Sequence, residues 1–193
     1  MAIDTGLAIA CGDLQSTGGI KQILLREWAA TDAVVYGNAA GEHDIDSILT
    51  GASSAAWFVY EFKNETPALT INATKENGST AFECGLTFML PKMDNVKANA
   101  LQDMLGACMM GMALDTNDNW WVLGVSEKYA NEDVASRSQT YLNVATIEGG
   151  TGAAYSDEDG FTVNLMARQF ELPRLYAGTI DVDTSALTAT TAA

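Results

Sequence analysis

The stretch ALTINATKENGSTAFECGLTFML, residues 68–90, indicates the fold class of this chain. Apolar and polar residues alternate on both sides of Asn77-Gly78, which is the pattern of half-buried β-strands. Asn and Gly tolerate positive φ and favour a two-residue type I′ turn. The stretch therefore predicts a long β-hairpin. One face of its second strand is apolar and comprises Phe82, Cys84, Leu86, Phe88 and Leu90.

Further strands are expected on either side of this hairpin. Alternating or continuously apolar runs predict strands at 20–28, 43–49, 56–64, 108–114, 120–125, 139–148 and 161–170. In the run 56–64, we expect Phe58, Tyr60 and Phe62 to share one face, because side chains two residues apart point the same way in a strand. The polar segment 127–138 is expected to be a loop, and the glycine-rich segment 149–160 a mobile connector.

The period changes after Pro91, where the sequence predicts a helix over 94–105. Asp94 or Asn95 can cap its N-terminus. Helical spacing places the following apolar residues on one stripe: Val96, Ala100, Leu101, Met104 and Leu105. We therefore expect this stripe to pack on the strands.

About eight strands and one helix favour a mainly β fold. We expect an antiparallel β-sandwich or partly open barrel with one α-helix and long loops. Residues 1–183 are expected to form one β-sandwich domain with an N-terminal arm. The small-residue tail 184–193 is expected to be disordered or to order only on assembly.

Composition excludes several classes of function. The 193 residues include 10 Lys and Arg and 25 Asp and Glu, for a net charge of −15. Charge-driven binding to nucleic acid or anionic lipid is therefore not expected. The apolar stretch around 105–114 is shorter than the roughly 20 residues of a membrane helix, so no membrane partner is expected. Three scattered cysteines are interpreted as buried free thiols in a reducing compartment.

Catalytic and metal-binding patterns are weak. The single histidine, His43, is flanked by Glu42 and Asp44, but neighbours in a strand point to opposite faces. We therefore interpret His43 as a solvated structural residue. The acids 157–159 lack the ligand spacing of a calcium loop, and no zinc or nucleotide motif occurs. We expect no catalytic residue, metal or cofactor, and no enzyme activity.

Two segments carry a family resemblance. TGLAIACGDL at 5–14, followed by GGIK at 18–21, and YSDEDGFTVNL at 155–165, followed by ELPRLY at 171–176, resemble tailed-bacteriophage virion proteins. Among these, tail tube proteins best match the expected architecture. The resemblance implies a structural subunit of the virion tail, assembled in the host cytoplasm with other tail proteins. It also implies stacked, six-membered homo-oligomeric rings in which strands of all subunits complete one inner barrel.

The resemblance assigns roles to particular side chains. DNA would pass through the channel without specific binding, because carboxylates facing it repel phosphate. Candidates for these channel-facing acids are Glu61, Glu76 and Glu83, although they could equally face the outer surface. Candidates for subunit assembly are Trp120, Trp121, Phe161, Val163 and Leu165. The apolar residues of 161–170 could instead line the core of a single subunit.

Other functions fit the same pattern. A head decoration protein, a head–tail joining protein or a minor capsid β-sandwich would have similar composition. A carbohydrate-binding β-sandwich could use Trp57, Trp120 or Trp121 as stacking platforms. A small hydrolase could use a carboxylate pair such as Glu61 and Glu83.

Overall fold

The computed structural model describes residues 18–29, 32–37, 43–49, 56–127, 140–154 and 157–192. These residues form thirteen strands and one helix, α1 (Asn95–Met104). The strands are β1 (Ile20–Glu27), β2 (Ala33–Tyr36), β3 (Asp44–Leu49), β4 (Trp57–Tyr60), β5 (Ala68–Glu76), β6 (Ser79–Pro91), β7 (Met109–Asp115), β8 (Trp120–Leu123), β9 (Leu142–Gly150), β10 (Gly160–Gln169), β11 (Arg174–Tyr176), β12 (Thr179–Asp183) and β13 (Thr188–Ala192).

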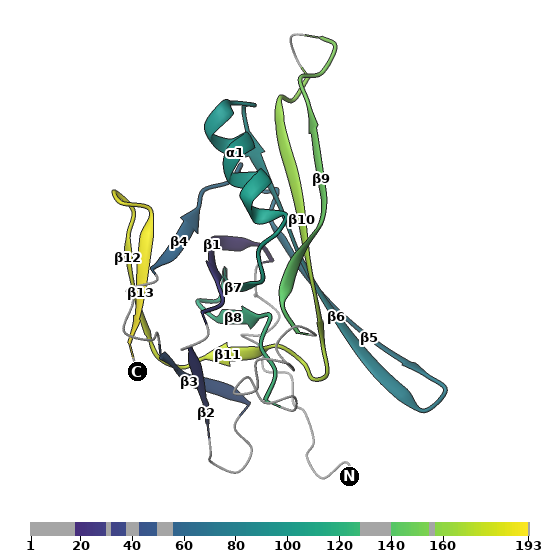
Figure 1. Cartoon of the computed structure of the whole chain (residues 1–193), viewed down its shortest axis with the longest axis vertical. Helices are drawn as coiled ribbons and strands as arrows, with labels where there is room; N and C mark the ends of the chain where they lie inside the picture. Colours follow the sequence, from purple (N-terminus) through teal and green to yellow (C-terminus); the bar gives the residue numbers. More distant parts are fainter. Residues whose placement is uncertain are drawn as a thin grey trace.

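The strands form one sheet that curls into an open half-barrel (Figure 1). Its main path runs in the order β12-β13-β4-β1-β7-β8-β11-β3-β2. A branch leaves β7 through the pair Met109 and Leu142 and continues as β9-β10-β6-β5. The predicted fold class, mainly β with one helix, is confirmed.

The central strands β1 and β7 are buried on both faces. Ile23 and Leu25 of β1 point into one core, and Leu24 between them points into another. In β7 likewise, Met109 and Ala113 belong to the first core, and Met110 and Met112 belong to the second. Burial on both faces explains why these strands have continuous apolar runs instead of alternation.

The first core lies between the central strands and the branch β9-β10-β6-β5. It includes Phe88 and Leu86 of β6 and Leu165 of β10, all with at most 1% of their surface exposed. The second core, which contains Trp57, Ile45 and Val122, fills the opposite face of the central strands. The chain therefore packs β-strands on both sides of a central layer.

The hairpin predicted from residues 68–90 is formed by β5 and β6. Asn77 and Gly78 have φ of 50° and 81°, and Glu76 pairs with Ser79 across them. This is the two-residue turn that the sequence predicts. The β5–β6 hairpin and the β9–β10 hairpin extend to opposite ends of the molecule (Figure 1), because β6 and β10 run antiparallel.

Helix α1 confirms the predicted cap but corrects the predicted stripe. The Asp94 carboxylate accepts a hydrogen bond of 2.8 Å from the backbone N–H of Lys97. Leu101 and Met104 are buried, whereas Val96 and Leu105 are 78% and 56% exposed. The helix lies with the 97/101/104 side toward the first core, so the two ends of the predicted stripe turn toward solvent.

The C-terminal tail and both ends of the 149–160 segment form strands that the sequence did not predict. Residues 188–192 form β13, which pairs with β12 and with β4. Gly149 and Gly150 extend β9 and pair with the start of β10. Gly149 lies against the Phe161 ring, where a Cβ atom would come within 2.7 Å of the ring. Backbone pairing thus stabilises segments whose composition alone suggested loops.

Three further expectations are decided by burial. Phe58 and Tyr60 lie opposite Leu25 and Ile23 of β1 and line one groove, so these two share a face as predicted. Tyr60 and Phe62 pack on the first core, whereas Phe58 is 55% exposed. Cys84 is buried as predicted, but Cys108 is exposed. Cys11, Glu42 and all of the predicted loop 127–138 except Glu127 lie outside the described residues. Within the described chain, no helix is long and apolar enough to span a membrane.

Candidate assembly and channel surface

The branch β9-β10-β6-β5 presents a polar face on the side opposite the first core. Cross-strand register defines its rows. One row contains Asn72, Glu83 and Arg168; the next contains Thr70, Gly85, Met166 and Asn143; a third contains Ala68, Thr87, Asn164 and Thr146; and a fourth contains Met89, Thr162 and Glu148. We call this surface the outer face.

Side chains of the outer face bond to one another across the strands. The Thr87 hydroxyl donates to Asn164 Oδ1 at 2.7 Å, and Asn164 Nδ2 donates to the Thr146 hydroxyl at 2.7 Å. The three residues belong to β6, β10 and β9, so the ladder crosses three strands. Such cross-strand pairs stabilise a sheet, and here they also use polar groups that would otherwise be available to a ligand.

The acidic candidates do not gather on one face. Glu83 lies on the outer face, where Arg168 Nε donates to its Oε1 at 3.2 Å. Glu61 is exposed but follows β4 in the segment that leads to β5, beside a groove with Lys21 and Gln22. Glu76 lies at the end of β5, and its side chain is outside the described part of the structure. Of the three, Glu83 alone has a described side chain on the outer face.

Both ends of the branch are open edges in the described part of the chain. β5 pairs with β6 alone, and β9 pairs with β10 along its length but with β7 only at Leu142. An open edge presents unpaired backbone donors and acceptors that another chain can pair with. Within the described residues, the branch thus has two long edges on opposite sides that no other strand covers.

The backbone groups on the β5 edge can be assigned from the turn. Residues that flank a two-residue turn exchange both of their hydrogen bonds, and bonded pairs then alternate along the hairpin. Glu76 and Ser79 flank the turn, so Thr74 and Asn72 also direct their backbone groups toward β6. Ile71 and Ala73 therefore direct theirs toward the open edge.

Trp121, one of the assembly candidates, lies beside this edge. A groove of about 400 Å³ is lined by residues at the start of β5, by Ile20 and by Trp121. Ile71 also lines it and is 37% exposed. Trp120 is half-buried on the other face of β8, packed against the second core. The adjacent tryptophans thus have different surroundings, as alternation in a strand requires.

The three candidates from β10 pack within the chain. Val163 and Leu165 have 0% and 1% of their surface exposed, and both belong to the first core. Phe161 is half-buried and packs on the same core. The assignment of Val163 and Leu165 to an assembly surface is therefore corrected, because a side chain buried in its own subunit has no surface left for a neighbour.

Burial also limits the tryptophans that could serve as stacking platforms in a carbohydrate-binding module. Trp57 is 1% exposed and belongs to the second core, so its ring has no face available for a sugar. Trp121 is half-buried, and its indole nitrogen donates to Asp115 Oδ2 at 3.0 Å. The same carboxylate accepts hydrogen bonds from the backbone of Asn117 and Asn119.

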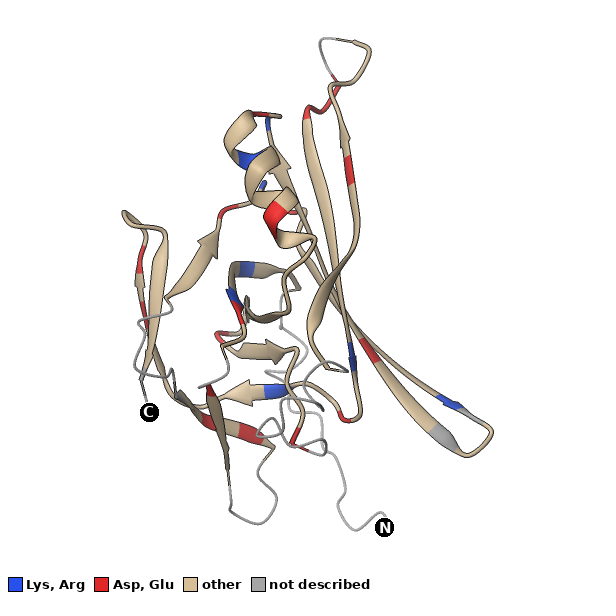
Figure 2. Cartoon of the chain, in the orientation of Figure 1, with Lys and Arg blue, Asp and Glu red and all other residues tan. Residues whose placement is uncertain are grey.

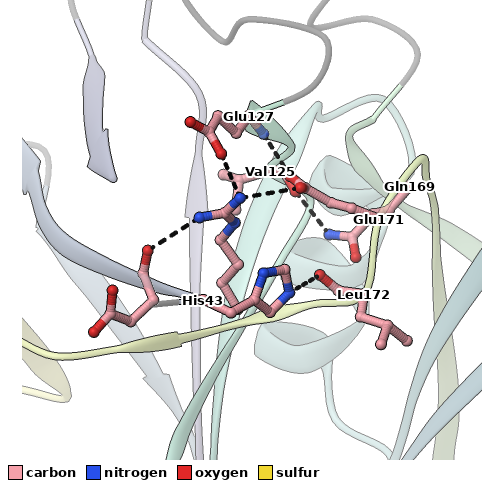
Figure 3. A network of polar contacts seen from close by, with 8 residues as sticks. His43, Val125, Glu127, Gln169, Glu171 and Leu172 are labelled. Carbon is pink, nitrogen blue, oxygen red and sulfur yellow. Dashed lines mark hydrogen bonds and ion pairs between the residues drawn. The ribbon is translucent and has the colours of Figure 1, made fainter. Parts of the chain in front are cut away.

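His43 lies near a cluster of polar side chains that joins β11 to neighbouring segments (Figure 3). The Arg174 guanidinium is bound to the carboxylates of Glu127 and Glu171, and its Cζ lies 4.9 Å above the centre of the Tyr36 ring. His43 Nε2 lies 3.1 Å from the carbonyl oxygen of Leu172. His43 is exposed, as expected, and its bond is to backbone. Both carboxylates bind one guanidinium, so Arg174 of β11 holds together the segments that follow β8 and β10.

Charge is distributed over many elements. Acidic and basic positions lie along the whole molecule in Figure 2 and do not collect on one strand. Among the described residues, six Lys or Arg side chains form ion pairs: Lys21, Arg26, Lys63, Lys97, Arg168 and Arg174. The described residues hold no group of three or more His, Cys, Asp or Glu side chains that could bind a metal ion.

The buried thiol of Cys84 is chemically quiet. Burial raises its pKa to about 11, and its Sγ donates to Gln169 Oε1 at 3.3 Å. A thiol with this pKa stays protonated at neutral pH, and the thiolate is the reactive form. Cys84 therefore acts as a small core residue.

Comparisons with known proteins identify no relative. The chain matches no protein-family model, no curated protein and no solved structure.

Proposed function

We propose that this chain is a structural subunit of a tailed-bacteriophage tail tube. Copies of the chain associate into rings, most simply of six, and the rings stack with other tail proteins around a channel that DNA passes through. Assembly takes place in the host cytoplasm. The observation that carries the proposal is the branch β9-β10-β6-β5, which has a polar outer face and, among the described strands, an open edge on each side.

Head-to-tail pairing of these edges would close a barrel. If β5 of one subunit pairs with β9 of the next, every subunit uses both edges and a ring leaves none exposed. This contact is heterologous, and a heterologous contact generates a ring when its rotation closes. The core of each subunit would lie outside the barrel, so the outer face would line the channel.

The groove beside β5 supports this pairing. A strand added to the β5 edge would lie over the groove that Ile71 and Trp121 line. Contact there would cover apolar surface that is half-buried in the single chain. In this proposal Trp121 lies at the subunit contact, whereas Trp120 packs against the second core of its own subunit.

A proline on the β5 edge tests the proposal. Ala73→Pro removes an N–H that points away from β6, so the hairpin keeps its own bonds while the edge loses a donor. Ala73→Ser keeps the N–H and is the matched control. Negative-stain microscopy and light scattering should show rings or tubes of uniform bore for the wild type and Ala73→Ser, and smaller species for Ala73→Pro.

Folding of the variants must be compared by circular dichroism and urea unfolding. A wild-type chain that stays monomeric at high concentration, with and without salt, would contradict the proposal. Rings of unchanged size and yield with Ala73→Pro would contradict the role of the β5 edge.

A further inference from the structure

Arg168 is the one cation among the described rows of the outer face. Its position in β10 is directly opposite Glu83 in β6, and the two side chains form an ion pair with 3.2 Å between Nε and Oε1. Arg168 is largely exposed, with 75% of its side-chain surface accessible. Register alone keeps the two charges together, because directly opposed residues have Cβ atoms about 5 Å apart.

We propose that Glu83 masks Arg168 from polyanions, so that the outer face does not retain DNA. This inference rests on the proposed function, because it assigns the outer face to the channel. An exposed guanidinium binds phosphate well, with donors arranged for two parallel bonds. The carboxylate of Glu83 occupies the Nε side of this group and cancels its charge locally.

The neighbouring rows support the same role. The Thr87, Asn164 and Thr146 side chains bond to one another, so they offer few free donors to a phosphate. The remaining charge in the described rows is the carboxylate of Glu148, which repels DNA. With its one cation paired to Glu83, the outer face has no unpaired positive charge in its described rows.

This inference differs from general repulsion by the acidic chain. At a net charge of −15, loss of any single carboxylate changes long-range repulsion by a similar small amount. Loss of Glu83 also exposes Arg168, whereas loss of Glu61 exposes no such partner in the described structure. Glu61→Gln is thus a matched control that removes the same charge.

The experiment measures binding of fluorescein-labelled duplex DNA by anisotropy at low ionic strength, with four proteins: wild type, Glu83→Gln, Glu61→Gln and Glu83→Gln/Arg168→Gln. We expect Glu83→Gln to bind at least about tenfold more tightly than the other three, and its binding to weaken as salt is raised. The double variant should return to wild-type behaviour, since it has no cation to expose.

Equal DNA binding by Glu83→Gln and Glu61→Gln would overturn the inference, and so would strong binding by the wild type. Sedimentation of the same samples shows whether rings form. A failure of the masking inference can therefore be told apart from a failure of the proposed function. If rings form but the two single variants behave alike, masking fails and the tube proposal stands. If Glu83→Gln alone binds DNA while every protein is monomeric, masking stands and the tube proposal fails.

Discussion

The indole nitrogen of Trp121 donates a 3.0 Å hydrogen bond to Oδ2 of Asp115, across the turn that joins β7 to β8. Asp115 also accepts from the backbone N–H groups of Asn117 and Asn119, at 2.8 and 2.9 Å. One carboxylate thus organises the turn and orients the tryptophan that lines the groove beside β5. The geometry of this candidate contact therefore depends on the ionised state of Asp115.

Acid should weaken this turn. Burial raises the Asp115 pKa, but hydrogen bonds from Asn119 and Trp121 outweigh that effect, and the net pKa is lowered. A lowered pKa means that the stabilisation is fully present above the unfolded-state value, about 4, and is lost as pH falls through the folded-state value. Asp115→Asn should reduce stability at pH 7 and flatten the dependence of Tm on pH below about 4.

Thermal unfolding followed by fluorescence at several pH values measures this effect. Asp118→Asn is the control, because Asp118 lies on the same turn but pairs with Lys21 at the surface. If Tm depends on pH in the same way in Asp115→Asn and in the wild type, carboxylates other than Asp115 determine the loss of stability in acid.

Leu101 of α1 and Leu105 at its C-terminal end should differ in their contribution to stability, because one is buried and the other exposed. Leu101 is 3% exposed and lies in the first core, so Leu101→Ala should cost roughly 2–5 kcal/mol. Leu105 is mainly exposed, so Leu105→Ala should cost less than about 0.5 kcal/mol. Urea unfolding measures both values. Similar costs for the two substitutions would mean that the helix is rotated from the position described.

Gly124 is required by the backbone after β8. Its φ is +83°, and a Cβ atom there would lie 2.8 Å from the Met109 carbonyl oxygen and 2.9 Å from the Leu142 nitrogen. Gly124→Ala should therefore cost at least about 1–2 kcal/mol from the left-handed conformation alone. Gly106→Ala is the control, because Gly106 has open space around its Cβ position, and it should change stability by less than about 1 kcal/mol. Chemical unfolding that shows equal effects would contradict this account.

The Arg26–Asp32 pair should behave as a buried ion pair. Both residues are 2% exposed, and Arg26 Nη2 lies 2.5 Å from Asp32 Oδ1. Asp32→Ala leaves a buried guanidinium without its carboxylate and should cost roughly 3–5 kcal/mol. Arg26→Met in addition to Asp32→Ala should recover part of that loss. The exposed Lys21–Asp118 pair is the comparison, since Lys21→Ala should cost no more than about 1 kcal/mol from loss of the pair. A double variant less stable than Asp32→Ala would argue against this interpretation.

Local patterns were sufficient for the elements whose signals lie close together in the chain. The Asn77-Gly78 turn, the alternation on either side of it and the Asp94 cap all act over a few residues, and each is present as predicted. Most predicted strands agree with the structure to within a few residues at their ends. Short elements such as β2, β11, β12 and β13 were missed because pairing with distant strands, rather than local pattern, stabilises them.

The candidate sites were less predictable, because a residue's role depends on what lies across from it. Because side chains alternate along a strand, the sequence places Glu83 on the face of β6 that is not apolar. Only the register of β6 against β10 shows that Arg168 lies beside it. Composition likewise cannot show whether Val163 and Leu165 face a core or a neighbouring subunit. The curl of the sheet places both residues against β6 and the central strands.

The sequence by itself determined the acidic character of the chain, the β5–β6 hairpin with its turn, the single helix and the predominance of strands, since these follow from residue type and short-range periodicity. Tertiary structure alone decided which side of α1 is buried, how β13 joins β4, and which edges of the branch β9-β10-β6-β5 stay open. Those features depend on contacts between residues far apart in the chain, where the free energy of burial and backbone pairing outweighs local preference.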